Sequence, residues 1–246
     1  MDYEGLELER VMVIYAHPDD AEFGASGTCA KWAREGVQVT YCMVTNGASG
    51  SSDPEMTREK LADIRRQEQL QAAEILGIEN VIFMGFEDGY LYPDLELRKA
   101  VAREIRKVKP DAIISQDPTS RYWAPAYLNH PDHIAVGEVV FRSINPDASS
   151  GLMFPELWKE EGLEPHKPKA LFVVAFSDPD VFIDITDTID LKVKALEAHA
   201  SQVGEWPVGE FIRERNKQIA AAAKEKGFEG AFEYAESYKL FRLEEF

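Results

Sequence analysis

Four short apolar runs, separated by amphipathic segments, are the feature that most constrains how this chain can fold. The runs cover residues 11–15, 37–44, 80–84 and 112–115. Helical spacing of apolar residues connects them, in segments 23–35, 57–76 and 95–108. Strands that alternate with helices form parallel sheets through right-handed crossovers. We therefore expect an α/β fold, a Rossmann-like three-layer sandwich with a mostly parallel sheet and helices on both faces.

A histidine and two aspartates follow the first of these predicted strands. His17 precedes Pro18, which lacks a backbone N–H and favours extended geometry in the residue before it, so the turn is stiff. One imidazole beside Asp19 and Asp20 suits a divalent ion such as zinc, and a spare carboxylate could take protons from a bound water. An aspartate after a strand can instead simply cap the next helix. From these residues alone, either aspartate could be the ligand.

A second motif places two more histidines at the start of a predicted helix. Pro131 suits the first position of a helix, so we expect His130 at the cap and His133 in the first turn. Ligands of open parallel sheets bind outside the carboxyl ends of the strands, where both motifs would meet. Three of the five histidines thus lie in two motifs that indicate a shared metal site.

These motifs resemble those of the PIG-L/LmbE-like family of zinc-dependent N-acetylglucosaminyl deacetylases. The resemblance covers roughly residues 10–238 and includes weaker features in the same order, namely Thr45-Asn46-Gly47, Arg65 with Glu68, Asp88-Gly89, Lys194 with His199-Ala200-Ser201-Gln202, and Ala235-Glu236. It implies a hydrolase of linear amides that uses a zinc-bound water to remove the N-acetyl group from an N-acetylglucosamine-type conjugate. It also implies a small-molecule amino-sugar substrate and a homo-oligomeric protein.

The resemblance also implies roles for individual residues. By this likeness His17, Asp20 and His133 bind the zinc ion, while Asp19 is the catalytic base. His130 receives a catalytic role, either polarising or proton-donating, and it stays open whether His130 or Asp19 protonates the leaving amine. Two imidazoles and a carboxylate also allow Fe2+ or Co2+.

Three further residues near the motifs are interpreted separately. The resemblance makes Arg65 a substrate-binding residue, although an ion pair with Glu68 is the alternative. Some relatives carry a tyrosine where this chain has Leu128, so Tyr127 is left out of the catalytic set. His199 is given no chemistry, because a lone histidine on an amphipathic helix is more often packed and hydrogen-bonded.

Composition excludes several classes of partner. A net charge of -17 without a basic stripe predicts no binding to nucleic acid. The acidic N-terminus lacks an apolar leader and no apolar run reaches membrane-spanning length, so we expect a cytoplasmic protein without membrane insertion. Cys29 and Cys42 have no metal-binding or redox spacing, which predicts reduced core residues.

No linker or internal repeat divides the 246 residues, so we expect one domain over residues 1–246. Within it, residues 1–9 form an N-terminal extension, and 145–168 form a long loop that serves as an interface or a lid. Two other functions stay open: a metal-dependent phosphoesterase, which would need more ligands, and a non-catalytic sugar-binding module that retains the fold.

Overall fold

A seven-stranded sheet forms the centre of the computed structural model, which describes residues 2–3, 5–123, 127–174, 178–228, 230 and 232–243. In the order in which they lie side by side, its strands are β10 (Val181–Asp184), β11 (Ala235–Arg242), β9 (Ala170–Val174), β6 (Ala112–Ser115), β3 (Arg10–Tyr15), β4 (Gln38–Thr45) and β5 (Asn80–Phe86). The five strands from β9 to β5 are parallel, and β11 is antiparallel to both of its neighbours. The expected mostly parallel sheet is confirmed.

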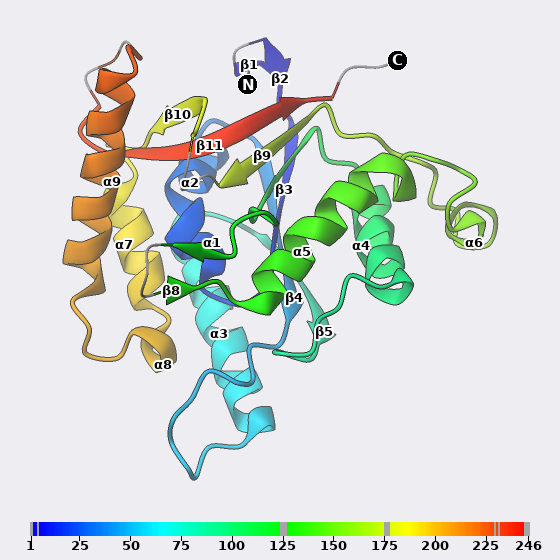
Figure 1. The fold of residues 1–246 in the computed structure, drawn as a ribbon, viewed down its shortest axis with the longest axis horizontal. Helices are drawn as coiled ribbons and strands as arrows, with labels where there is room; N and C mark the ends of the chain where they lie inside the picture. The colour runs from blue at the N-terminus through cyan, green and yellow to red at the C-terminus, as the bar shows by residue number, and fades with distance from the viewer. Residues whose placement is uncertain are drawn as a thin grey trace.

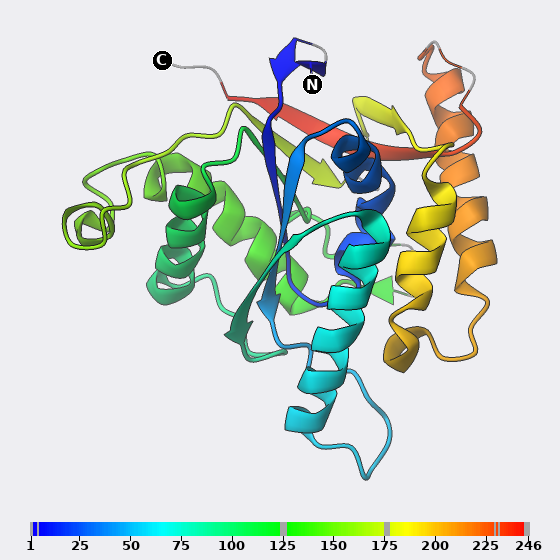
Figure 2. The ribbon, with the colours of Figure 1, turned by 180° about the vertical axis from the view of Figure 1, so that it is seen from behind.

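Helices cover both faces of this sheet (Figures 1 and 2). In chain order the helices are α1 (Asp20–Gly24), α2 (Ser26–Arg34), α3 (Arg58–Leu76), α4 (Leu95–Val108), α5 (Pro131–Arg142), η1 (Ser143–Asp147), α6 (Pro155–Lys159), α7 (Ile189–Glu197), α8 (Ala200–Val203) and α9 (Val208–Glu225). Helices α4 and α5 pack on one face, while α1, α2, α3, α7 and α9 lie on the other. Two small hairpins complete the described structure, namely β1 (Asp2–Tyr3) with β2 (Leu6–Glu7), and β7 (Tyr122–Trp123) with β8 (Tyr127–Leu128).

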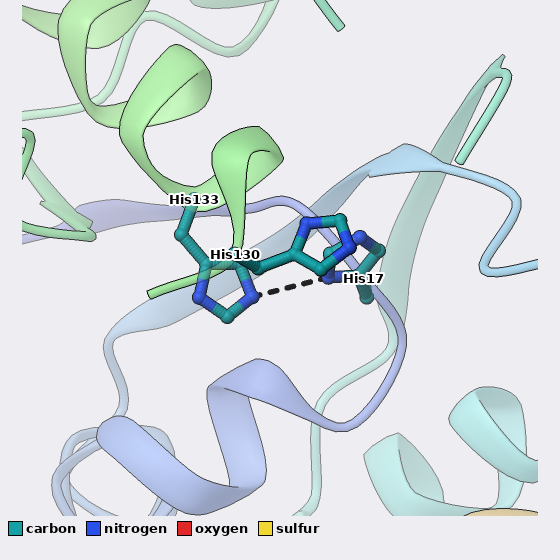
Figure 3. A group of neighbouring side chains, drawn as sticks. All are labelled: His17, His130 and His133. Atoms are coloured by element: carbon teal, nitrogen blue, oxygen red, sulfur yellow. Dashed lines mark hydrogen bonds between the residues drawn. The ribbon is translucent and has the colours of Figure 1, made fainter. Parts of the chain in front are cut away.

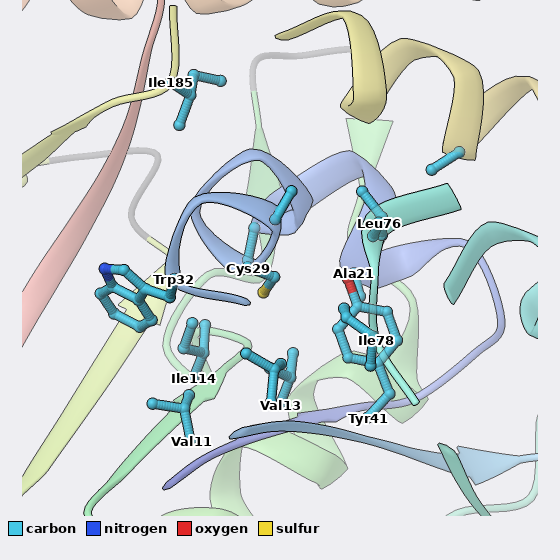
Figure 4. Close-up of a cluster of buried hydrophobic side chains, with 14 of the residues drawn as sticks. Val11, Val13, Ala21, Cys29, Trp32, Tyr41, Leu76, Ile78, Ile114 and Ile185 are labelled. Atoms are coloured by element: carbon cyan, nitrogen blue, oxygen red, sulfur yellow. The ribbon is translucent and has the colours of Figure 1, made fainter. Parts of the chain in front are cut away.

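Strand β3 is apolar along its length because each face of the sheet is buried. Val11, Val13 and Tyr15 belong to the core cluster under α1, α2 and α3, part of which Figure 4 shows. Met12 and Ile14 belong to the second cluster, under α4 and α5. A strand alternates its side chains between faces, so a strand covered on both sides requires a continuous apolar run.

The order of the strands places a crevice beside β3. The chain adds β4 and β5 on one side of β3 and then returns to add β6 and β9 on the other side. In open α/β sheets, ligands bind at the carboxyl ends of the strands where the strand order reverses in this way. The loops after β3 and β6 carry the two histidine motifs and lie at this point.

Helix boundaries agree with the sequence at some positions and differ at others. Helix α4 spans the predicted residues 95–108, and His130 caps α5 with Pro131 in the first turn, as expected. The single helix expected over residues 23–35 is wrong, because α1 ends and α2 begins around Ala25, whose φ of -137° is not helical.

The expected long loop at residues 145–168 contains the end of η1 and the short helix α6, and it is attached to α4. The fully buried Arg106 of α4 donates hydrogen bonds to the carbonyl oxygens of Asp147, Ala148, Ser150 and Met153. The role of residues 145–168 as an interface or a lid stays a prediction.

Among the described residues no helix combines the length and apolar character that crossing a membrane requires.

Candidate metal centre

The two histidine motifs meet at the carboxyl ends of β3 and β6 (Figure 3). His17 follows β3, whereas His130 and His133 stand at the N-terminal end of α5. The ring centroid of His17 lies 4.6 Å from that of His130 and 5.1 Å from that of His133. Residues more than a hundred positions apart in the sequence therefore present three imidazoles to one small volume.

Three side chains in this volume bring their donor atoms to the spacing of metal ligands. Nδ1 of His17 lies 3.1 Å from Nε2 of His133 and 3.3 Å from Oδ2 of Asp20. Oδ1 of Asp20 lies 3.1 Å from Nε2 of His133. Zinc bonds of about 2.0–2.2 Å in tetrahedral geometry place neighbouring ligand atoms roughly 3.3 Å apart. The donor types and their spacing fit a divalent ion with a fourth position left for another ligand.

The outer nitrogens of His17 and His133 each face an oxygen acceptor. Nε2 of His17 lies 3.0 Å from Oδ1 of Asp88 and 3.3 Å from Oδ2 of Asp132. Nδ1 of His133 lies 2.9 Å from Oδ1 of Asn129. Contacts of this kind fix the tautomer and the orientation of a metal-binding imidazole.

The tautomers that follow leave two lone pairs facing each other. Asn129 donates its amide to the carbonyl oxygen of Ser120, so its remaining oxygen must accept the proton on Nδ1 of His133. His17 likewise directs an N–H at two carboxylates. In neutral rings the inner nitrogens, 3.1 Å apart, both present lone pairs beside a carboxylate oxygen, which is repulsive unless a proton or a metal cation lies between them.

The electrostatics of the centre favour a positive charge at the same point. Burial lowers the pKa of His17, but hydrogen bonds to Asp132 and Asp20 outweigh burial and hold the pKa well above its ordinary value. Burial would raise the pKa of Asp20, yet His133 and His17 hold it well below its ordinary value. The surrounding carboxylates thus stabilise either a proton or a metal cation next to His17.

Asp20 is anchored through one oxygen. Its Oδ2 accepts the backbone N–H of His17 at 2.8 Å and the side-chain amide of Gln116 at 3.1 Å. Its Oδ1 is directed at His133. The sequence left both aspartates open as ligands, and this arrangement favours Asp20.

Asp19 lies beside this centre and is held by Arg65. Its backbone has φ of 91°, a left-handed conformation that is uncommon for aspartate. Burial raises the pKa of the Asp19 carboxyl to about 6, and the Arg65 guanidinium, 3.2 Å away, opposes the rise. Arg65 also donates to the carbonyl oxygens of Pro18 and Gly47.

The alternative reading of Arg65, an ion pair with Glu68, is not what the structure shows. Arg65 is only 4% exposed and pairs with Asp19. Glu68 instead accepts hydrogen bonds from the backbone N–H and the hydroxyl of Ser201, at 2.7 and 2.6 Å.

A buried polar chain continues behind Asp19. Gln69 accepts the backbone N–H of Asp19 at 3.1 Å and donates its amide to Glu22 at 3.0 Å. The other carboxylate oxygen of Glu22 lies 3.3 Å from Nε2 of His199. All three side chains are fully buried. His199 therefore belongs to the surroundings of Asp19 rather than to the metal centre.

His130 has a different environment from the two ligand histidines. Its Nδ1 accepts the backbone N–H of Asp132 at 3.2 Å, so its Nε2 carries the proton when the ring is neutral. Burial, followed by the charge of His17, lowers the pKa of His130. A neutral imidazole with a fixed N–H can donate a hydrogen bond to an oxygen atom that enters the centre.

Sequence reasoning missed four of these residues. Asp132 stands inside the second motif, and Asp88 belongs to one of the weaker matching features, but neither was given a role. Glu22 and Gln69 carried no signal, because only the approach of α3 to α1 brings them together. The spacing of residues along the sequence does not show that a buried carboxylate lies next to a histidine in the fold.

Comparisons with known proteins show which family and which solved structures the chain resembles. Residues 12–144 match the PIG-L family, described as GlcNAc-PI de-N-acetylase. Diacetylchitobiose deacetylase of Thermococcus kodakarensis is 34% identical over 209 residues, which are 83% of this chain and 74% of that protein. A probable N-acetyl-alpha-D-glucosaminyl L-malate deacetylase 2 of Bacillus anthracis is 30% identical over 205 residues, 78% of this chain and 80% of that protein. The solved structure of N,N'-diacetylchitobiose deacetylase from Pyrococcus horikoshii has a TM-score of 0.84 at 29% identity, covering 96% of this chain and 85% of that one.

Proposed function

Because the chain belongs to the PIG-L family, we propose that it is a zinc-dependent deacetylase that removes the acetyl group from an N-acetylglucosamine-type conjugate. The observation that carries this proposal is the close approach of two imidazole nitrogens and one carboxylate. His17 Nδ1 and His133 Nε2 are 3.1 Å apart, and Asp20 lies 3.3 Å from the first through Oδ2 and 3.1 Å from the second through Oδ1. The names of the relatives support the choice of amide and of sugar.

His17, Asp20 and His133 would hold the ion. A bound divalent ion lowers the pKa of a water ligand to about 7 and polarises a carbonyl group. The two imidazoles would be kept in orientation by acceptors for their outer N–H groups, which are Asp88 and Asp132 for His17 and Asn129 for His133. Two imidazoles and one carboxylate also suit Fe2+ or Co2+.

Asp19 would be the general base that takes the proton from the attacking water. A pKa of about 6 allows Asp19 to be ionised at neutral pH and still accept a proton. Arg65 holds one carboxylate oxygen, and Gln69 accepts the backbone N–H, so both the side chain and the backbone of Asp19 are held in place. The strained left-handed backbone of Asp19 fits a residue whose position is set by its function.

His130 would donate a hydrogen bond to the oxygen that gains charge when the amide carbonyl is attacked. Its Nε2–H is available because Nδ1 already accepts the N–H of Asp132. Either His130 or the protonated Asp19 can then give a proton to the leaving amine. Arg65 would contact the substrate, as the resemblance to the family implies. Its ion pair with Asp19 and its hydrogen bond to the carbonyl oxygen of Gly47 support a positioning role in addition.

Acetate release tests the function itself. Protein purified without chelators should release acetate and free amine in equal amounts from at least one N-acetylglucosaminide of a panel. Treatment with a chelator should abolish the release, and one equivalent of Zn2+ per chain should restore it. Hydrolysis of phosphate monoesters without acetate release would favour the phosphoesterase alternative, and binding of sugars without either reaction would favour the non-catalytic one.

Asp132→Asn is expected to weaken metal binding by about 10- to 100-fold, the usual effect of losing such a partner of a metal-binding histidine. Asparagine keeps the shape of the buried Asp132 but removes the charge that faces Nε2 of His17. Competition with a chromophoric chelator measures the affinity. Asp190→Asn, at an exposed position on α7, is the control and should leave the affinity unchanged. Equal affinities of both variants and the unaltered protein would contradict this role of Asp132.

A further inference from the structure

A cavity of about 430 Å³ opens directly beside the candidate metal centre. Asp20 and His133 form part of one wall. Phe23, Trp206 and Phe211 form another, and most of the lining consists of carbon atoms. We call this cavity the aromatic pocket. A group bound in the pocket would therefore lie next to whatever reacts at the centre.

The aromatic wall is built from rings that pack on each other yet stay open to the cavity. The rings of Phe23 and Trp206 are stacked with centroids 6.2 Å apart, and those of Trp206 and Phe211 are 5.1 Å apart. Trp206 is 46% exposed and Phe211 is 45% exposed. Leaving this much aromatic surface in water forgoes hydrophobic stabilisation, and such exposed apolar surface commonly marks a binding site.

The amide side chains that line the pocket are already engaged within the protein. Gln116 accepts the backbone N–H of Ala16 at 3.1 Å and donates to Asp20. Asn129 donates to Ser120 and accepts from His133. These two amides therefore have little hydrogen-bonding capacity left for the hydroxyls of a second sugar ring.

We propose that the aromatic pocket binds a largely apolar aglycone, an aryl or alkyl group. This inference rests on the proposed function, because it takes the reacting group to be the acetamide at C2 of a glucosaminide. The aglycone is attached at the neighbouring carbon, C1. It therefore enters the pocket whose wall includes Asp20 and His133 when the acetamide lies at the centre.

The test compares three glycosides of N-acetylglucosamine by kcat/KM for acetate release: the 4-nitrophenyl glycoside, the methyl glycoside and N,N'-diacetylchitobiose. The 4-nitrophenyl glycoside should be preferred over the methyl glycoside by roughly tenfold to a hundredfold, the range expected for burying one aromatic ring. Trp206→Ala should reduce this preference at least fivefold. Trp158→Ala, which removes a tryptophan of similar exposure, 38%, from α6, should leave the preference unchanged. Preference for N,N'-diacetylchitobiose over the 4-nitrophenyl glycoside, or an unaltered preference in Trp206→Ala, would overturn the proposal.

Binding measured without turnover separates failure of the pocket from failure of the proposed function. The nitrophenyl group quenches tryptophan fluorescence, so the 4-nitrophenyl glycoside should quench the unaltered protein by way of Trp206. Trp206→Phe keeps a ring in the wall and should lose most of the quenching while still binding. If no glycoside releases acetate but this quenching pattern holds, the proposed function fails and the pocket stands. Equal quenching in Trp206→Phe and the unaltered protein would refute the pocket.

Discussion

Asp19→Asn is expected to lower kcat for acetate release by about two to four orders of magnitude, the usual contribution of a general base. Asparagine has nearly the shape of aspartate but cannot accept a proton from water at neutral pH. The three donor atoms of the metal centre come from other residues, so one metal ion per chain should remain bound. Steady-state kinetics and elemental analysis on the same preparation measure both quantities.

Arg65→Ala is the companion to this variant. Because Arg65 lies 3.2 Å from Asp19 and donates to Gly47, its loss should lower kcat by releasing the base from its position. A rise in KM with unchanged kcat would instead make Arg65 a substrate contact only. Full activity of Asp19→Asn would remove Asp19 from the role of base, whatever Arg65 does.

His133→Ala is expected to lose both the metal and all measurable turnover. His133 supplies a nitrogen that lies 3.1 Å from His17 Nδ1 and 3.1 Å from Asp20 Oδ1, so the variant leaves only two of three protein ligands. A site with only two protein ligands binds a divalent ion far less tightly than a site with three. Elemental analysis after dialysis against metal-free buffer gives the stoichiometry.

His166→Ala provides the matched control for that experiment. His166 is partly buried and its ring contacts the carbonyl oxygen of Pro110, with no part in the centre. The His166→Ala variant should keep one metal ion per chain and full activity. Stoichiometric metal in dialysed His133→Ala would contradict the ligand set.

The sheet could be predicted because its physical causes are local. The run around β3 is apolar on both faces, and the structure buries both. Proline and histidine at the start of α5 predicted the cap correctly, since Pro131 lacks the N–H that a first-turn residue does not need. The break at Ala25 was not predicted, because no proline marks it in the sequence.

The surroundings of the centre depend on contacts between distant segments. Asp88 reaches His17 because the turn after β5 approaches α5, where Gly89 donates its N–H to Asp132 at 2.7 Å. Spacing along the chain carries no record of that approach. The aromatic pocket was missed for the same reason, since Phe23 and Trp206 are far apart in the sequence and stack only in the fold.

Anomalous diffraction at the zinc absorption edge, from crystals of protein purified without chelators and supplied with Zn2+, tests the metal centre most directly. The account predicts one peak at about 2 Å from His17 Nδ1, His133 Nε2 and a carboxylate oxygen of Asp20, the bond length usual for such ligands. A peak bound by other side chains, or no peak between these three, would contradict it.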